Sequence, residues 1–362
     1  MDKLRRSLVS LPSLAFLRKG MASEADGPAS GDRGITVWHG DVQRVGHLGD
    51  AQDDLNVMGR VGDWRNLDLL SYRINKAAPT PLAFRAYRRL VEDGTFNADV
   101  PIGRLNAGEN IIAIDAVYRD GQQLHKEITV RRGIGSQALP LRIRWSKLKH
   151  FQEAGQAVDG HWELTPTGLH TKQVGYDRVF LLGERGWRDY QVRTSVTINA
   201  VSHETSPLSG GNGLGIILRF AGHITGGHRH FPSGQPKWGY QPFGAIGWLR
   251  WARGKDPETP QTQFYPGDGD RSQDKQLVPI KIGATYGMIF ACATMPDAPD
   301  GRGVTRYRYK VWPASGAEPD SWTWEHVQTS AHALRNGGFT LLAHHIDATF
   351  GDVDVTLPGD AA

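Results

Sequence analysis

NGLGIILRFAGHITGGHRHFPSGQPKWGYQPFGAIGWLRW, residues 212–251, combines two apolar runs with a loop rich in Gly, Pro and His. The first run is typical of a β-strand, and the second is rich in Trp. Core positions favour Leu, Ile and Val, whereas Trp, Tyr and His have a polar edge that must be hydrogen-bonded or left in water. The stretch therefore predicts either a surface that binds a ligand or the interior of a β-sandwich, and both interpretations stay open.

Strand patterns continue on both sides of this stretch. Apolar and polar residues alternate with a period of two, as in a strand with one buried face, and no segment shows helical periodicity over three turns. We therefore expect an all-β unit over residues 141–358, of the size of a large jelly roll. The clearest alternating segments are 192–198, 214–220, 286–290, 306–311, 339–344 and 353–357.

The part before this unit predicts a smaller β-sandwich. Residues 35–132 contain short strand-like runs separated by turn signals, and Asp120-Gly121 between two apolar runs indicates a hairpin. Residues 133–140, GIGSQALP, form a predicted linker. Residues 1–34 are expected to be a disordered leader or a degenerate export signal, and residues 21–34 show no apolar periodicity. The expected strands are 35–39, 55–61, 69–74, 82–84, 96–100, 111–118 and 126–130.

Composition excludes several classes of protein. The 42 Lys and Arg against 38 Asp and Glu give a net charge of +4 over 362 residues, without the dense basic stripe that binds nucleic acid. A mild attraction for acidic polymers, including uronic-acid glycans, is compatible with this charge. The single cysteine, Cys292, cannot form an intramolecular disulfide, and thiolate zinc sites are excluded by count. No apolar run reaches the length of a membrane span.

The amino terminus permits two interpretations. MDKLRRSLVSLPSLAFLRKG, residues 1–20, has paired Arg5 and Arg6 before an apolar stretch and is similar to a shortened twin-arginine export signal. Export would place the protein outside the cell or in the periplasm. If Met21 is the true start, a cytoplasmic location follows instead.

Residues 72–116 resemble bacterial immunoglobulin-like modules. The resemblance is carried by YRIN at 72–75, FNADVP at 96–101 and LNAGENIIAIDA at 105–116. Such modules serve as spacers or braces and bring no catalytic residues, so the resemblance implies that role here.

Residues 140–358 resemble the concanavalin A-like (laminin G-type) jelly rolls of bacterial secreted proteins. The matching motifs are GERGWRDYQV at 183–192, GLGIILRF at 213–220, RYRYKVW at 306–312 and FGDVDVT at 350–356. That fold is shared by lectins, carbohydrate-binding modules, hydrolases and lyases, so the resemblance implies a fold more than an activity.

The predicted partner is a carbohydrate, in particular a polysaccharide. Flat aromatic rings suit the apolar faces of sugars, and His, Arg and Asp side chains suit their hydroxyl groups. Asp177 and Arg178 could line the groove beside Trp238 and Trp248, or pair at a sheet edge. The full set of expected ligand-binding residues is Arg219, His223, His230, Trp238, Tyr240, Trp248, Trp251, Asp177 and Arg178.

An enzyme acting on the same glycan is the first alternative. The E-x-D-x-E triplet of retaining hydrolases in this fold is missing, and Glu163 is the glutamate best placed on a strand. A lyase would need a His or Tyr base and cationic groups against a uronate carboxylate, which Arg219, Arg250, Arg306 and Arg308 could supply. The candidate catalytic residues are His223, His228, His230, Tyr240 and Glu163.

Two further possibilities remain from the sequence. The protein could be a structural or adhesive surface protein in which the rings are core. Calcium could bind at Asp268 and Asp270 in PGDGDRS, because it prefers oxygen ligands on flexible loops. Nucleotide-dependent, serine-hydrolase and zincin motifs are missing, so those chemistries are not expected.

Overall fold

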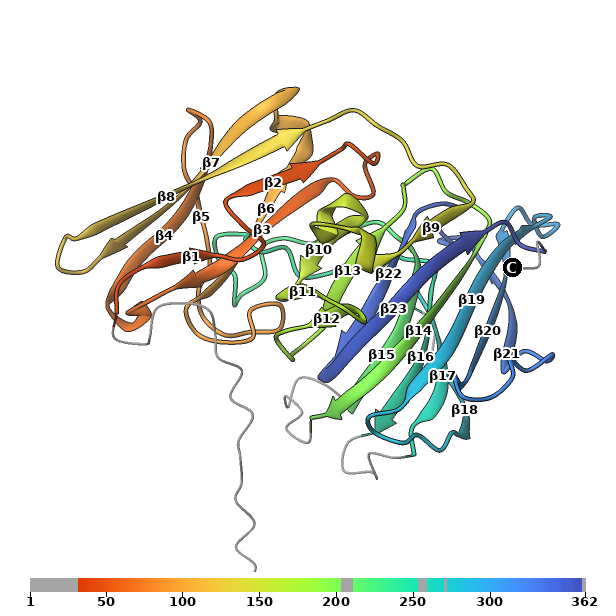
Figure 1. Ribbon diagram of the computed structural model, residues 1–362. Helices are drawn as coiled ribbons and strands as arrows, with labels where there is room; N and C mark the ends of the chain where they lie inside the picture. Colours follow the sequence, from red (N-terminus) through yellow and green to blue (C-terminus); the bar gives the residue numbers. More distant parts are fainter. Residues whose placement is uncertain (1–31, 203–210, 253–258, 270–271, 360–362) are drawn as a thin grey trace, which may run out of the picture.

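The structure, a computed structural model, describes residues 32–202, 211–252, 259–269 and 272–359, apart from the side chains of residues 275–277. Regular structure in these segments consists of β-strands and a few short 3₁₀ turns. The strands form four sheets, arranged as two β-sandwiches that follow each other along the chain (Figure 1). The all-β prediction is therefore confirmed.

The first sandwich pairs a sheet of three strands with a sheet of five, and buried side chains from both sheets form one apolar cluster. The three-stranded sheet contains, in spatial order, β1 (Ile35–Val37), β3 (Asp54–Val61) and β6 (Thr95–Pro101). The five-stranded sheet contains β2 (Val42–Val45), β8 (Gln123–Arg132), β7 (Gly108–Tyr118), β4 (Leu67–Ile74) and β5 (Thr80–Pro81).

The hairpin β7–β8 forms as its sequence predicts. Ile112, Ile114 and Ala116 alternate along β7 and are fully buried, because every second residue of a strand points to the same face. The turn that follows contains Gly121 with a φ of 87°, a backbone conformation that glycine adopts without steric cost. Residues 82–84, expected as a strand, follow the short strand β5 instead.

The second sandwich pairs a seven-stranded with an eight-stranded sheet. The seven-stranded sheet runs β10 (Gly155–Asp159), β13 (Arg178–Leu182), β22 (Gly338–His344), β15 (Gly211–Phe220), β16 (Ala245–Ala252), β17 (Gln261–Pro266) and β18 (Gln273–Leu277). The eight-stranded sheet runs β11 (Trp162–Thr165), β12 (Gly168–Thr171), β23 (Ile346–Thr356), β14 (Tyr190–Val201), β19 (Thr285–Met295), β20 (Gly303–Pro313) and β21 (Trp324–Ser330), with β9 (Leu141–Ile143) paired to β23.

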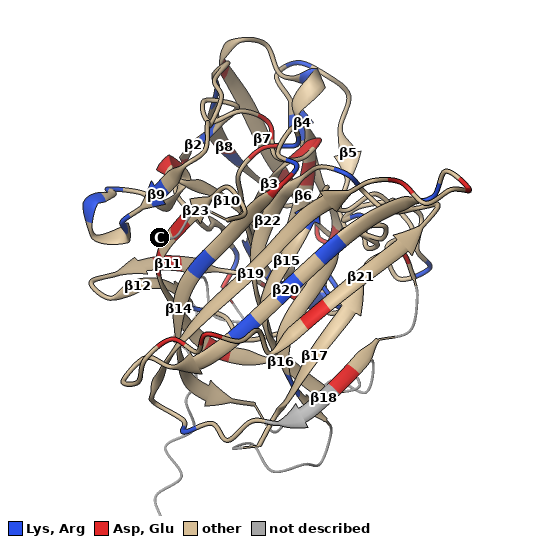
Figure 2. Cartoon of the chain, turned by 90° about the vertical axis from the view of Figure 1, so that its right-hand side faces the viewer, with Lys and Arg blue, Asp and Glu red and all other residues tan. Residues whose placement is uncertain are grey.

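The two large sheets differ in how their outer faces are covered. On β20 of the eight-stranded sheet, Tyr307 and Tyr309 point into the core, while Arg306, Arg308 and Lys310 occupy the alternate positions. Figure 2 shows these basic positions along the outer face of the sheet. In the seven-stranded sheet, β15 is instead buried along its whole length, so both faces of the sheet are covered there.

A separate apolar cluster covers the outer face of the seven-stranded sheet. Leu214, Ile216 and Leu218 of β15 belong to the core between the two large sheets, whereas Ile217 belongs to the second cluster. This cluster contains residues from strands of the seven-stranded sheet and from neighbouring loops. Its members are Ala51, Val158, Val179, Leu181, Ile217, Phe220, Phe243, Ile246, Trp248 and Leu342. Ala51 comes from the first sandwich, so part of the cover is supplied by that sandwich.

The two sandwiches also share their main core. Trp38 and Met58 of the first sandwich lie in the same apolar cluster as the inner faces of the two large sheets. Between the sandwiches, residues 133–140 run at the surface, where Ile134 is 91% exposed. The contact between the sandwiches is therefore made by packed side chains in addition to the connecting segment.

Of the predicted leader, residues 1–31 lie outside the described residues. Within the described segments, no helix has the length and apolar character needed to cross a bilayer.

Candidate functional site

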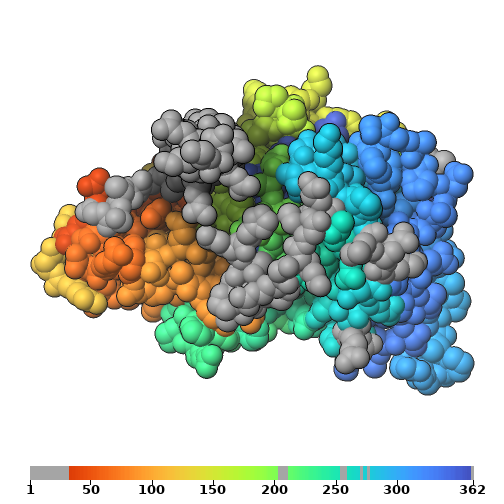
Figure 3. Space-filling view, turned by 90° about the horizontal axis from the view of Figure 1, so that it is seen from below, coloured from red at the N-terminus to blue at the C-terminus, as the bar shows by residue number. Residues whose placement is uncertain are grey.

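The loop of residues 221–244 joins β15 to β16 and lies on the outer face of the seven-stranded sheet. Figure 3 shows this loop, in green, beside the orange atoms of the first sandwich. Backbone hydrogen bonds attach it there: the amide of Ala83 donates to the carbonyl oxygen of Gln235 at 3.1 Å. The loop is thus held between the two sandwiches.

The loop, the sheet and the first sandwich enclose a cavity of about 620 Å³. This volume lies within the range of small-molecule binding sites. Its wall contains both aromatic rings and charged groups. The described lining residues are Arg88, Tyr176, Asp177, Thr225, Trp238, Gly239, Tyr240, Gln241, Phe243, Ile246, Trp248, Arg250, Gln263, Tyr265, Ser272 and His344.

Strand alternation determines which residues of β16 reach the cavity. Ile246, Trp248 and Arg250 line it, while Leu249 and Trp251 point into the core between the large sheets. The side-chain period of two places the first three on one face of the strand and the other two on the opposite face.

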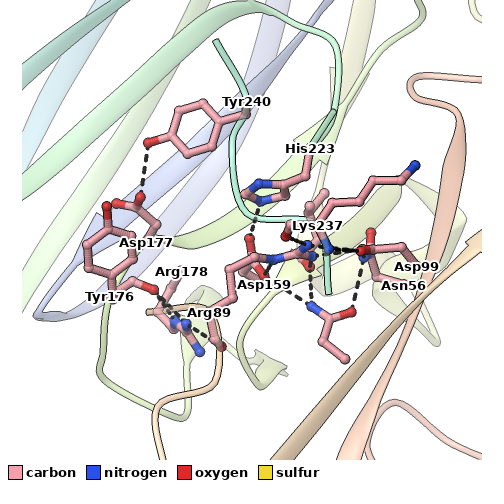
Figure 4. Close-up of polar contacts among 12 residues, drawn as sticks. Asn56, Arg89, Asp99, Asp159, Tyr176, Asp177, Arg178, His223, Lys237 and Tyr240 are labelled. Carbon is pink, nitrogen blue, oxygen red and sulfur yellow. Dashed lines mark hydrogen bonds and ion pairs between the residues drawn. The ribbon is translucent and has the colours of Figure 1, made fainter. Parts of the chain in front are cut away.

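Asp177 is at the centre of a hydrogen-bonded group in the cavity wall (Figure 4). The hydroxyl of Tyr240 donates to Oδ2 of Asp177 at 3.0 Å, and Nδ1 of His344 lies 2.6 Å from Oδ1. Burial opposes ionisation, but the charge of His344 and the two hydrogen bonds outweigh it and lower the pKa of Asp177. The carboxylate is therefore ionised at neutral pH.

The two tyrosines beside this carboxylate keep their protons at neutral pH. Burial, followed by the charge of Asp177, raises the pKa of Tyr240 well above its usual value. For Tyr176 the charge of Asp177 is the larger cause and burial the second, and its pKa is raised as well. Both hydroxyls are therefore hydrogen-bond donors toward the cavity region.

Trp248 and Arg250 form a second part of the wall. The indole Nε1 of Trp248 donates to Oε1 of Gln263 at 2.6 Å, which fixes the ring. The Arg250 guanidinium lies 4.9 Å from the Trp248 ring centroid and donates to the carbonyl oxygen of Asn212 at 2.9 Å. Burial lowers the pKa of Arg250, because a low-dielectric environment disfavours its charge.

Arg88 enters the cavity wall from the first sandwich. Its guanidinium carbon lies 5.2 Å from the Trp238 ring centroid and 5.6 Å from that of Tyr176. Its φ of 49° is in the left-handed region, which is uncommon for a residue with a long side chain. Such backbone conformations persist only where the surroundings hold them.

The neighbouring Arg89 supplies that constraint. It is buried, and its guanidinium pairs with Asp159 at 2.5 Å and with Asp99 at 3.0 Å, linking the first sandwich to β10 (Figure 4). Asp159 also contacts Nε2 of His223 at 2.6 Å. Burial disfavours the charge of Arg89, but the two carboxylates raise its pKa overall. The Arg89 guanidinium is thus fixed in position, and this also fixes the backbone of the preceding residue, Arg88.

Several expected ligand-binding residues lie around this cavity. Asp177, Trp238, Tyr240 and Trp248 all line it. His230 is exposed and stacks on Tyr87 with ring centroids 3.8 Å apart, outside the lining.

Other expected ligand residues are buried where a ligand cannot reach them, and this corrects the predicted binding face. Trp251 is 3% exposed within the main core. Arg219 is fully buried and donates hydrogen bonds to the carbonyl oxygens of Leu334 and Arg188.

Arg178 and His223 are interior residues as well. Arg178 is 1% exposed and donates to the carbonyl oxygen of Tyr176. His223 is 5% exposed and is held by Asp159. Both side chains hold loops behind the cavity, and neither lines its wall.

The candidate catalytic residues do not all come together. His223 packs edge-on against Tyr240 at a ring-centroid distance of 5.2 Å, and His228 and His230 stack with centroids 5.3 Å apart. Of these, Tyr240 lines the cavity, while His228 packs between Tyr87 and Trp238 at ring-centroid distances of 5.0 and 4.9 Å, outside the lining. Glu163 lies on β11 of the other large sheet, where it pairs with His170 at 3.0 Å. The predicted catalytic role of Glu163 is therefore wrong for this cavity, because the residue belongs to a surface ion pair away from it.

The calcium site stays a prediction. Asp270 lies outside the described residues, and Asp268 is half-buried in the turn after β17. Among the described residues, no group of three or more His, Cys, Asp or Glu side chains is arranged to hold a metal ion.

Sequence reasoning did not assign Arg88, His344, Gln263 and Tyr265 to the site. Alternation along β17 and β22 could have placed Gln263, Tyr265 and His344 on one sheet face, had the strand order been known. Arg88 gave no such signal, because it belongs to the part of the chain expected to act only as a spacer.

Neither a family model nor a curated protein matches the sequence. Solved structures with some similarity include the VIP36 exoplasmic/lumenal domain in its Ca²⁺/Man3GlcNAc-bound form, with 9% identity, a TM-score of 0.34, and coverage of 61% of this chain and 93% of that one. A xylan beta-1,4-xylosidase from Bacillus halodurans C-125 has 10% identity, a TM-score of 0.34, and coverage of 91% and 77%.

A third similar structure is described as belonging to the carbohydrate-binding modules of the beta-sandwich superfamily. It has 9% identity, a TM-score of 0.18, and coverage of 91% of this chain and 98% of that one. With TM-scores of 0.34 and below, these similarities assign neither a fold family nor a function to this chain.

Proposed function

We propose that the protein binds a carbohydrate in the cavity on the outer face of the seven-stranded sheet. The observation that carries this proposal is the composition of the cavity wall. Trp238, Trp248 and Tyr265 line the cavity, and so do the polar side chains of Asp177 and Gln263. Sugars present both apolar faces and hydroxyl edges, so the rings and polar groups of one cavity can act together on one ligand.

We propose the fold assignment that accompanies this function in the same way. The first sandwich is an immunoglobulin-like module, supported by its two sheets around one core within residues 35–132. The second is a concanavalin A-like jelly roll, supported by its sheets of seven and eight strands. Calcium binding and export to the periplasm or the outside of the cell are further proposals that rest on the sequence alone.

Cleavage of the bound glycan is a second candidate function, favoured by the hydrogen-bonded group of Tyr240, Asp177 and His344. A protonated tyrosine can donate a proton to a leaving oxygen, and the neutral form of a histidine beside a carboxylate can accept one. Among the described lining residues only Asp177 has a carboxylate. A mechanism with two carboxylates therefore has less support at this cavity than a lyase mechanism with Tyr and His.

The test is native affinity electrophoresis of the protein in gels that contain single polysaccharides, both neutral and acidic. Parallel incubations are assayed for new reducing ends and, by ultraviolet absorbance, for the unsaturated ends that a lyase releases. Retardation without products supports binding, and unsaturated products support the lyase. A protein that migrates unchanged in every gel and releases nothing would leave a structural or adhesive role.

A further inference from the structure

The positive groups of the cavity exceed its negative groups. Arg88 and Arg250 line it, while Asp177 is the one carboxylate among the described lining residues. That carboxylate already accepts a hydrogen bond from Tyr240 and contacts His344. It is therefore occupied within the wall and does not pair with either arginine.

Arg88 has no carboxylate partner among the described residues. Its Nε is buried without a hydrogen-bond partner there, and rings of Tyr87, Tyr176 and Trp238 surround its guanidinium at 5.2 to 5.6 Å. Aromatic faces attract a cation but do not satisfy its N–H donors. A guanidinium in this position has donors left for a ligand.

The guanidinium of Arg250 also has N–H donors left for a ligand. Within the described part of the chain, its guanidinium donates to one carbonyl oxygen, of Asn212, and lies against the Trp248 ring. The planar guanidinium group recognises carboxylate and sulfate oxygens through paired N–H donors. Because burial removes water from this group, an anionic partner gains more here than at an exposed site.

Arg88 is also held in place, which a solvent-exposed arginine would not be. The adjacent Arg89 is tied to Asp99 and Asp159 in the interior, and the Tyr87–Leu90 turn is closed by two backbone hydrogen bonds. Pre-positioned side chains bind with a smaller loss of conformational entropy. The first sandwich thus supplies a fixed cation to a cavity built mainly by the second.

We propose that the cavity is selective for acidic glycans, whose carboxylate or sulfate groups are bound by Arg88 and Arg250. This inference rests on the proposed carbohydrate binding and specifies its substrate class. It also gives the first sandwich a part in recognition, in addition to the role of a spacer. The two arginines reach the same cavity from different sandwiches, so neither sandwich alone contains the complete anion site.

The experiment is isothermal titration calorimetry of the full chain with three kinds of oligosaccharide. A neutral gluco-oligosaccharide, a uronate oligosaccharide and a sulfated oligosaccharide form the three arms. We expect one of the two acidic ligands to bind at least about tenfold more tightly than the neutral one, because hydrogen bonds between a guanidinium and an anion are stronger than those between neutral groups. Which acidic ligand prevails distinguishes carboxylate from sulfate recognition.

Four variants locate the binding. Arg88→Gln and Arg250→Gln should each weaken the acidic ligand about tenfold or more. Arg85→Gln is the matched control, because Arg85 is exposed on the same segment as Arg88 and outside the cavity lining. It should bind like the wild type. Arg88→Lys, which keeps the charge without the planar donors, should restore part of the affinity, and melting temperatures verify that each variant is folded.

The outcomes separate this inference from the proposed function. Neutral ligands bound as tightly as acidic ones would overturn the acidic selectivity and leave carbohydrate binding standing. Binding to none of the three ligands would overturn both. Equal losses in the Arg85, Arg88 and Arg250 variants would indicate attraction to the overall positive charge and would also overturn the assignment to this cavity.

Discussion

Single positions along β16 decide between binding and packing. Trp248 and Trp251 are three residues apart and therefore point to opposite faces of the strand, the first to the cavity and the second to the core. Trp238, on the loop that covers the sheet, belongs to the same cavity as Trp248. Residues of one type in one stretch thus have different roles, which substitution can separate.

Trp238→Ala should weaken carbohydrate binding and cost less stability than the loss of a core tryptophan, because the ring is only half-buried. An aromatic contact is worth about 0.5–1.5 kcal/mol, so the dissociation constant should rise by up to about tenfold. Trp251→Ala should instead lower the free energy of unfolding by about 3–5 kcal/mol, the cost of truncating a buried large side chain. Urea unfolding and calorimetric titration measure the two effects. Equal destabilisation by both substitutions would contradict the assignment of Trp238 to the cavity.

The acid sensitivity of the fold should depend on His345. Burial, followed by the charge of His344, lowers the pKa of His345 to about 4, whereas an unfolded histidine titrates near about 6.5. Between these values the unfolded chain takes up a proton that the folded chain does not. The free energy of unfolding should therefore fall as the pH falls from about 6.5 to about 4.

His345→Asn removes this contribution and suits the position, because asparagine tolerates the left-handed φ of 58° found there. The difference in unfolding free energy between pH 7 and pH 5, from urea titrations, should be smaller in the variant than in the wild type. The matched control, His332→Asn, changes an exposed histidine and should keep the wild-type difference. If the unfolding free energy of His345→Asn depended on pH as strongly as that of the wild type, groups other than His345 would cause the dependence.

At the scale of elements, alternation made the long strands predictable. The expected segment 192–198 lies within β14 and the hairpin of residues 111–130 within β7 and β8, because long strands with one buried face repeat the period many times. Residues 324–330 were not expected as a strand but form β21, and residues 42–45 form β2. Both pair with one neighbour at the edge of a sheet, where only one side of the strand is hydrogen-bonded and the pattern is weaker.

The candidate site was predictable only in part, for a physical reason. The ring-rich stretch pointed to Trp238, Tyr240 and Trp248, which share the cavity, but alternation places Trp251 in the core and burial removes Arg219. Arg88 comes from a part of the sequence more than a hundred residues away. Its position depends on how the two sandwiches pack, which no local pattern in the sequence determines.

The segment that presents Arg88 depends on the buried ion pairs of Arg89. Arg89→Met would leave Asp99 and Asp159 in the interior without their cation, and removing one partner of such a pair costs about 3–5 kcal/mol. We expect a loss of unfolding free energy in that range and weaker binding of ligands that depend on Arg88. Arg85→Met, which disrupts an exposed contact with Asp93 at 3.8 Å, should change stability by less than about 0.5 kcal/mol. An Arg89→Met protein as stable as the control would show that the network contributes little.

At the scale of the whole molecule, packed and buried side chains join the two sandwiches, in addition to the connecting segment. Trp38 and Met58 complete the main core of the second sandwich, and the ion pair between Arg89 and Asp159 crosses between the two. Separating the sandwiches would expose these apolar side chains and leave buried charges unpaired.

The described residues should therefore unfold in one cooperative transition. Differential scanning calorimetry of the wild type should give a ratio of calorimetric to van't Hoff enthalpy near about 1, as two-state unfolding requires. Trp38→Ala removes a ring that lies at 8% exposure in the shared core and stacks on His161 at 5.0 Å, so it should lower the melting temperature and weaken the coupling. Two resolved transitions in the wild type would mean that each sandwich is stable alone, and that Arg88 reaches the cavity through a contact weaker than the packing implies.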